Sequence, residues 1–150
     1  MLNKQYLLFY YRNKLKQQEL SIIYSGGYKM ELYKFNKENG KRISIFNSDF
    51  VMSRIIQTEK VSHIGCMHLE ENGVIGFHQA VVPQLLLVLK GEGYVCGDKK
   101  EYVKVQSGDA VFWKKDEWHE TKTDKGLTAL VIESEELKPE LYMTLVNTCC

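Results

Sequence analysis

One segment constrains the fold of this chain more than any other: the apolar run QLLLVLK at Gln84 to Lys90, within a glycine-punctuated stretch from Gly73 to Gly93. As a strand, it would place Leu86 and Val88 on the same face as Gln84, and Leu85, Leu87 and Leu89 on the other. A strand that is apolar on both faces must be covered on both, so we expect it inside a sandwich or against a partner chain. The Gly91-Glu92-Gly93 break predicts a tight reversal into the strand that follows.

The chain beyond Met30 consists of short segments of alternating apolar and polar residues separated by Gly, Asn, Asp and Lys. This pattern is typical of an all-β domain, and the lack of long helical segments between the runs favours a sandwich or barrel over a βαβ fold. Ser134 to Leu145, with Pro139, is compatible with a short helical turn. The predicted strands are Glu31 to Phe35, Phe50 to Thr58, Val61 to Leu69, Val74 to Gln79, Gln84 to Lys90, Gly93 to Cys96, Glu101 to Val105, Ala110 to Trp113, Trp118 to Thr123 and Leu127 to Glu133.

Composition limits the classes of function. The chain has 150 residues, of which 44% are hydrophobic and 26% charged, as in one ordinary globular domain. A net charge of +1 without a basic patch argues against nucleic-acid binding. The apolar run Tyr6 to Tyr11 is too short for a signal peptide or a membrane span, and four cysteines without CxxC spacing predict reduced thiols and a cytoplasmic location.

The two ends of the chain differ in texture from its middle. We predict a leader or non-native extension over residues 1–29, a barrel over residues 30–135 and a C-terminal tail over residues 136–150. Helix formers in residues 2–24 permit a short helix. Gly26-Gly27 is either a linker or the product of codons reading GGAGG, a ribosome-binding sequence that would make Met30 the native start. Both alternatives stay open, and we expect the fold not to need residues 1–29.

A histidine stands in each of two glycine-containing stretches, His78 within Gly73 to Gly93 and His119 at the end of Gly108 to His119. These stretches resemble the two sequence motifs of the cupin superfamily, in particular of its small single-domain members. The first motif is G, five residues, HxH, three or four residues, E, six residues, G. His78 falls on its first histidine, Ala80 on its second, Gln84 on its glutamate and Gly91 on its closing glycine. In the second motif, His119 falls on the histidine, while Lys114, Asp116 and Thr123 replace a proline, a glycine and an asparagine.

The resemblance implies an all-β fold, the cupin double-stranded β-helix or jelly-roll barrel. It also implies a site for a divalent metal ion (Fe, Mn, Ni or Zn) at His78, Gln84 and His119. Because a neutral amide replaces the glutamate and an alanine replaces a histidine, we expect a degenerate site that holds less cation and tolerates neutral or anionic ligands better. The other interpretation is that His78 and His119 are pocket histidines that hydrogen-bond to Gln84 or to water, without any ion. Small-molecule binding is the leading hypothesis, a metal-dependent enzyme of the oxygenase or isomerase type is the alternative, and catalytic residues stay unassigned.

Aromatic side chains flank the motif residues and predict a pocket for a small ring-bearing or sugar-like ligand. Cys66 and His68 are interpreted as packing residues that could alternatively replace a missing metal ligand, and His63 as a solvated histidine. The predicted pocket residues are His78, Gln84, His119, Phe112, Trp113 and Tyr94.

The face carrying Leu85, Leu87 and Leu89 also suggests a quaternary structure. A lone barrel would expose these leucines as an apolar patch unless a second sheet or a second chain covered them. We therefore predict a homodimer with this face buried.

Overall fold

The computed structural model describes residues 30–146. Its strands are β1 (Glu31–Lys34), β2 (Lys41–Ile43), β3 (Phe50–Met52), β4 (Ser62–Leu69), β5 (Val74–Gln79), β6 (Gln84–Cys96), β7 (Val103–Gln106), β8 (Asp109–Trp113), β9 (Trp118–Lys122), β10 (Leu127–Ser134) and β11 (Thr144–Leu145). Single turns of 3-10 helix are η1 (Lys37–Asn39), η2 (Ile45–Asn47) and η3 (Pro139–Leu141). Within these residues, none of the helices has the length and apolar content to span a membrane. The helix permitted for residues 2–24 and the Gly26-Gly27 segment lie outside the described residues.

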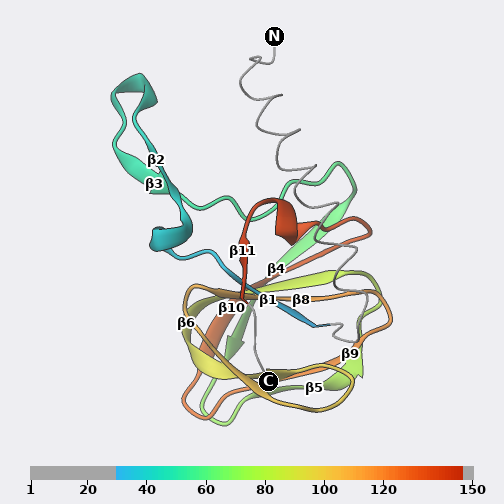
Figure 1. The fold of residues 1–150 in the computed structure, drawn as a ribbon. Coiled ribbons are helices and arrows are strands. Elements are labelled where there is room, and N and C mark those ends of the chain that lie inside the picture. The colour runs from blue at the N-terminus through green and yellow to red at the C-terminus, as the bar shows by residue number, and fades with distance from the viewer. Residues whose placement is uncertain (1–29, 147–150) are drawn as a thin grey trace.

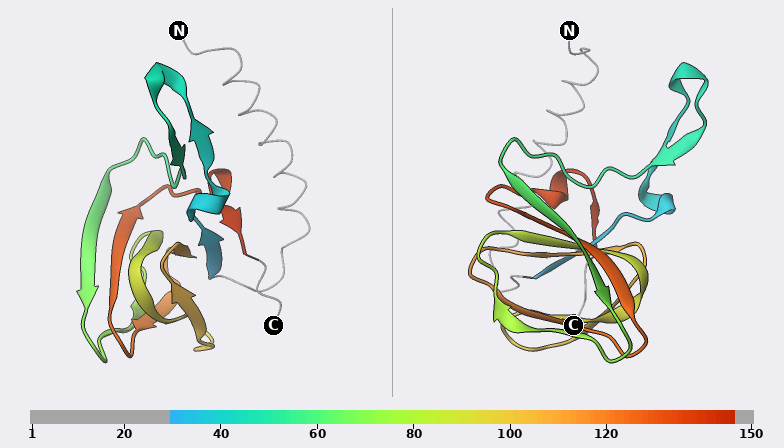
Figure 2. Two further views of the ribbon diagram at one scale, coloured as in Figure 1. Left: turned by 90° about the vertical axis from the view of Figure 1, so that its left-hand side faces the viewer. Right: turned by 180° about the vertical axis from the view of Figure 1, so that it is seen from behind.

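Nine strands form one sheet that curls into a barrel, with β6 running through both halves of it (Figure 1). One path through it runs β11-β1-β8-β6-β10-β4. Strands β7 and β9 also pair with β6, and β5 pairs with β9. In Figure 2, β10 lies between β4 and the first half of β6, as the pairing registers require. All these pairs are antiparallel, and the predicted all-β fold is confirmed.

The predicted reversal at Gly91-Glu92-Gly93 is wrong, because β6 runs without interruption through all three residues. Its first half pairs with β8 and β10, and its second half with β7 and β9. Gly91 has a φ of 82°, and a Cβ there would collide with the carbonyl oxygen of Gly126. The register with β10 also shifts by one residue beside Leu89. The glycines therefore bend one strand between two parts of the barrel instead of ending it.

The two faces of β6 bury different cores, as the alternation predicts. Leu86 and Val88 point into the barrel and pack with Val95, Val111 and Trp113. Leu85 and Leu87, 0% and 1% exposed, lie in a second core on the outside of the sheet.

The outer core is covered by the chain itself. Its cover includes Leu137 and Met143 from the C-terminal segment and Ile55 and Ile56 from the segment before β4. The expectation that this face needs a second chain is therefore wrong for Leu85 and Leu87, whereas Leu89 is 42% exposed. The homodimer stays a prediction without this support.

The segment predicted as a tail from residue 136 packs on the barrel as far as Val146. It contains η3, and β11 pairs with β1 through Tyr33 opposite Leu145. The sequence analysis predicted only the helical turn in this segment. The packing follows from the outer apolar face that β6 and β8 offer.

A two-stranded hairpin, β2 with β3, projects from the barrel (Figure 1). The strand predicted over Phe50 to Thr58 ends at Met52, and β2 was not predicted. The two strands are three residues long each and mostly exposed, so they carry little of the alternation on which strand prediction depends.

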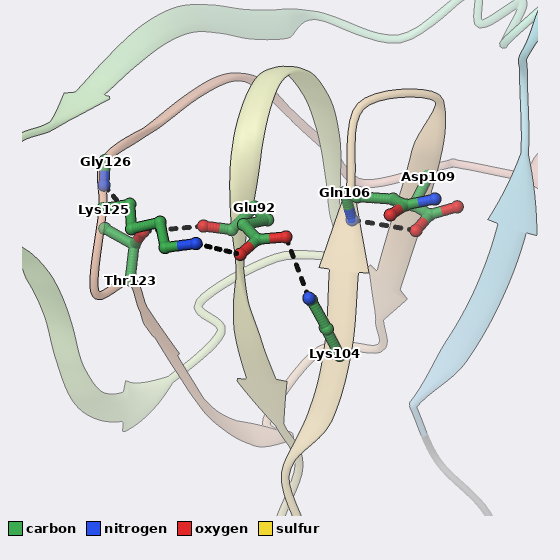
Figure 3. Close-up of polar contacts among 7 residues, drawn as sticks. All are labelled: Glu92, Lys104, Gln106, Asp109, Thr123, Lys125 and Gly126. Atoms are coloured by element: carbon green, nitrogen blue, oxygen red, sulfur yellow. Dashed lines mark hydrogen bonds and ion pairs between the residues drawn. The ribbon is translucent and has the colours of Figure 1, made fainter.

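Thr123, where the second motif has asparagine, fixes the turn between β9 and β10 (Figure 3). Its Oγ1 donates to the carbonyl oxygen of Glu92 at 2.6 Å and accepts from the Gly126 N–H at 3.0 Å. Glu92 in turn pairs with Lys104 and Lys125 at 2.9 and 3.6 Å. The buried Thr123 side chain thus stabilises the turn at one end of the barrel, and it is not part of the site around the two histidines.

Candidate functional site

Four of the predicted pocket residues converge on one small cavity inside the barrel. His78 comes from β5, Gln84 from β6, Trp113 from β8 and His119 from β9. The cavity has a volume of about 20 Å³, which is room for roughly one water molecule or one metal ion. The remaining lining residues, which sequence reasoning missed, are Met67, Ile75, Leu86 and Thr121.

The two histidines are held together by strand pairing. His78 on β5 lies directly opposite His119 on β9, and their ring centroids are 4.3 Å apart. The His119 ring also stacks on Trp113 at 4.5 Å with an interplanar angle of 26°. His119 is therefore in contact with both an indole and an imidazole, while His78 is exposed.

Backbone carbonyls set the tautomers of both histidines. Nδ1 of His78 lies 2.6 Å from the Gly76 carbonyl oxygen, and Nδ1 of His119 lies 3.4 Å from that of Glu117. A carbonyl oxygen can only accept, so in each neutral ring Nδ1 carries the hydrogen and Nε2 keeps its lone pair. Two imidazole Nε2 atoms are thus available as ligands. The hydrogen bond from Nδ1 of each ring to a backbone carbonyl resembles the bond by which metal-binding histidines are oriented.

Burial lowers the pKa of His119 below its ordinary value of 6.5. The neighbouring His78 also lowers this pKa, whereas the hydrogen bond to the Glu117 carbonyl and the charge of Glu133 raise it. His119 is therefore neutral at neutral pH, which is the form that binds metal ions.

The lowered pKa of His119 makes stability depend on pH. Below about pH 6.5 the unfolded chain takes up a proton that the folded chain binds only at lower pH, so the free energy of unfolding should fall as pH drops from 7 to 5. Thermal unfolding of the wild type and of His119→Phe across this range measures the effect. The variant should show a shallower slope, and parallel slopes would contradict the assignment.

Gln84 presents a defined end of its amide to the cavity. It is 7% exposed, and its Nε2 donates to Oε1 of Glu133 on β10 at 2.8 Å. Because a carboxylate accepts hydrogen bonds, it must face the NH₂ end of the amide, which leaves the carbonyl Oε1 for the cavity side. Glu133 was absent from the predicted site because it belongs to neither motif.

The other predicted pocket residues face elsewhere. Phe112 points to the outer core, since its neighbours Val111 and Trp113 point inward. Tyr94 alternates with the inward Val95 and does not line the cavity, and neither does the buried Ala80. The pocket prediction is therefore wrong for Phe112 and Tyr94. Strand alternation from His119 and Gln84 would have found Thr121 and Leu86, two residues further along their strands.

The donor set fits a single divalent ion held weakly. It comprises two neutral imidazole nitrogens and one amide oxygen around a cavity of ion size. Among residues 30–146, no three His, Cys, Asp or Glu side chains come together as a metal-binding group. Cys66 and His68, which alternate with the cavity-lining Met67, lie on the outer face of β4 and add no ligand.

The strands that carry the two motifs come together around this cavity. The first motif spans β5 and the start of β6, the second spans β8 and β9, and β5 pairs with β9 while β6 pairs with β8. An antiparallel barrel with both motif histidines facing inward is the arrangement that the resemblance implies. In the cupin motifs that this chain resembles, His78, Gln84 and His119 occupy motif positions, and Glu133 does not.

Comparisons with known proteins found similar chains among solved structures only. No family model matches the sequence, and no curated protein matches it. A cupin superfamily protein from Desulfitobacterium hafniense is 15% identical, with a TM-score of 0.47 over 53% of this chain and 72% of its own. An RmlC-like cupin from Shewanella frigidimarina is 17% identical, with a TM-score of 0.47 over 50% and 67%. A predicted oxalate decarboxylase from Thermotoga maritima is 23% identical, with a TM-score of 0.44 over 47% and 64%.

A larger hollow of about 500 Å³ lies at the far end of β10 from Glu133. Charged residues of both signs line it, among them Glu70, Lys90 and Lys125. Glu92, also in its wall, is already paired with Lys104 and Lys125 (Figure 3). The hollow therefore has a mixed lining in which Glu92 is already engaged in ion pairs.

Proposed function

We propose that this cupin binds a small molecule at the open side of a weak metal site formed by His78, His119 and Gln84. The observation that carries the proposal is the pairing of the two histidines with both Nδ1 atoms bonded to backbone carbonyls, which leaves both Nε2 atoms for a ligand. A pair of imidazoles in this state is suited to a divalent cation such as Zn²⁺, Fe²⁺, Mn²⁺ or Ni²⁺.

The size of the cavity limits how a small molecule could bind. A volume of about 20 Å³ admits an ion or a water molecule but no ring-bearing compound. A small molecule would therefore approach from the exposed side of His78, and contact the site through one or two polar atoms. The ligand set leaves coordination positions open for such a contact.

The alternative hypothesis is a metal-dependent enzyme of the oxygenase or isomerase type. The open coordination positions favour it, because a catalytic metal keeps room for substrate. The neutral amide at Gln84 and the cavity's lack of a directly lining carboxylate argue for weak binding instead.

Metal analysis and calorimetric titration test the proposal. Protein produced without added metal should contain little metal and bind one Zn²⁺ with a Kd of roughly 1 μM or weaker. His78→Ala and His119→Ala should each abolish this binding, because each removes one of the two nitrogen ligands. His68→Ala is the matched control on an outward face and should bind like the wild type.

Two outcomes would change the conclusion. Near-stoichiometric, tightly held metal that is lost in both histidine variants would favour the metal-dependent enzyme. Failure of the wild type to bind any of the four ions would show that His78 and His119 are pocket residues without a metal function.

The homodimer and the cytoplasmic location are proposed on the sequence alone. Light scattering of the purified protein measures the first, and a monomer would contradict it.

A further inference from the structure

We propose that Glu133 supplies to this site the negative charge that the first motif provides through a carboxylate at position 84. Glu133 would hold the Gln84 amide with its oxygen toward the cavity and supply negative charge from the next strand. The inference rests on the proposed metal site and adds a positioning residue to it. Since Glu133 lies outside both motifs, the sequence resemblance does not assign it.

Strand register places Glu133 beside the site. It lies opposite Gln84 on β6 and opposite His63 on β4, and Gln84 lies opposite Trp113 on β8. Directly opposed residues share a face, and Glu133 alternates with the inward-facing Val131. The row His63, Glu133, Gln84 and Trp113 therefore crosses the inner face of four adjacent strands. His63, interpreted from the sequence as a solvated histidine, is exposed at the end of this row.

The contact between the two side chains is specific. Gln84 Nε2 donates to Glu133 Oε1 at 2.8 Å, a charge-assisted hydrogen bond with a partly buried acceptor. The carboxylate excludes the flipped amide, because two acceptor oxygens would then face each other. Gln84 is thereby fixed with its only metal-binding atom, Oε1, available to the cavity.

Glu133 also changes the charge of the site. Replacement of the motif glutamate by Gln84 removes one negative charge from the cavity, which by itself favours neutral or anionic ligands. The carboxylate of Glu133 returns that charge at hydrogen-bond distance from Gln84, and it interacts electrostatically with His119. The cavity should therefore prefer cations over anions, contrary to the expectation from the motif alone.

Substitutions at position 133 separate the two contributions. Glu133→Leu removes both the acceptor and the charge, and should weaken Zn²⁺ binding by about tenfold or more in calorimetric titration. Glu133→Gln can still accept from Gln84 but lacks the charge, so its affinity should lie between those of Glu133→Leu and the wild type. Glu135→Gln, on the exposed residue two positions along, removes the same charge without contacting Gln84 and is the control.

Moving the carboxylate back to β6 provides a second test that does not depend on a weakened variant. Gln84→Glu combined with Glu133→Gln keeps one carboxylate and one amide side by side with their positions exchanged. This double variant should bind Zn²⁺ at least as tightly as the wild type. Gln84→Glu alone places two carboxylates together, so one should keep a proton and the metal-free protein should unfold at a lower temperature.

The outcomes distinguish the inference from the proposed function. If the wild type binds Zn²⁺ and folded Glu133→Gln and Glu133→Leu bind it equally well, Glu133 has no function at the site and the inference alone is overturned. If the exchanged double variant binds no Zn²⁺ although the wild type does, the inference is again overturned. A wild type that binds no divalent ion overturns the metal site itself, and Glu133's function with it.

Discussion

Leu87→Lys should destabilise the fold by roughly 4 kcal/mol or more, which is a large fraction of the total stability of a small domain. Leu87 is 1% exposed and lies in the outer core between the sheet and the chain's own C-terminal segment. The substitution would place an ammonium group where it has no water and no carboxylate partner among its core neighbours. Urea denaturation monitored by circular dichroism measures the change.

Leu89→Lys is the matched control on the same strand. Leu89 is 42% exposed, since the register shift beside it turns it out of the core, so its substitution should cost less than about 1 kcal/mol. A Leu87→Lys protein that stays folded but changes from dimer to monomer in light scattering would show that a second chain covers this face after all.

Ending the chain after Glu136 should prevent stable folding. The truncation removes Leu137 and Met143 from the outer core and β11 from the edge of β1. Each buried side chain contributes roughly 2 to 5 kcal/mol, so their joint loss approaches the whole stability of a domain of this size. Circular dichroism and thermal unfolding of the truncated protein test this result.

Single substitutions in the same segment serve as controls. Met143→Ala, at a position that is 7% exposed, should lower the free energy of unfolding by roughly 2 kcal/mol or more. Leu145→Ala, at a position that is 47% exposed, should change it much less. A truncated protein that melts cooperatively at the wild-type temperature would show that residues 137–146 form a dispensable tail.

Strand positions and faces could be predicted wherever alternation is strong. The strand Val74 to Gln79 was predicted with its observed ends, and the two faces of Gln84 to Lys90 separate into the inner and outer cores. The pattern is local in these segments, because each side chain's face follows from its position in one strand. Where strands are short and exposed, as in β2, the pattern carries no such information.

The motif spacing found the centre of the site but not its surroundings. It identified His78, Gln84 and His119, which the barrel brings to one cavity. Adjacency to these residues in the sequence was a poor guide to the pocket, because neighbouring residues in a strand point to opposite faces. Phe112, next to the lining residue Trp113, therefore lies in the outer core.

The sequence by itself determined an all-β barrel, a strand that must be covered on both faces, and a pair of histidines with an altered set of partners. Only the tertiary structure decided that β6 bends instead of reversing, because Gly91 relieves a close approach to Gly126 in the turn before β10. It also decided that residues 137–143 cover the outer core, and that Glu133 contacts Gln84 across 49 positions of sequence. These three features depend on contacts between distant segments, whose register is fixed only when the barrel closes.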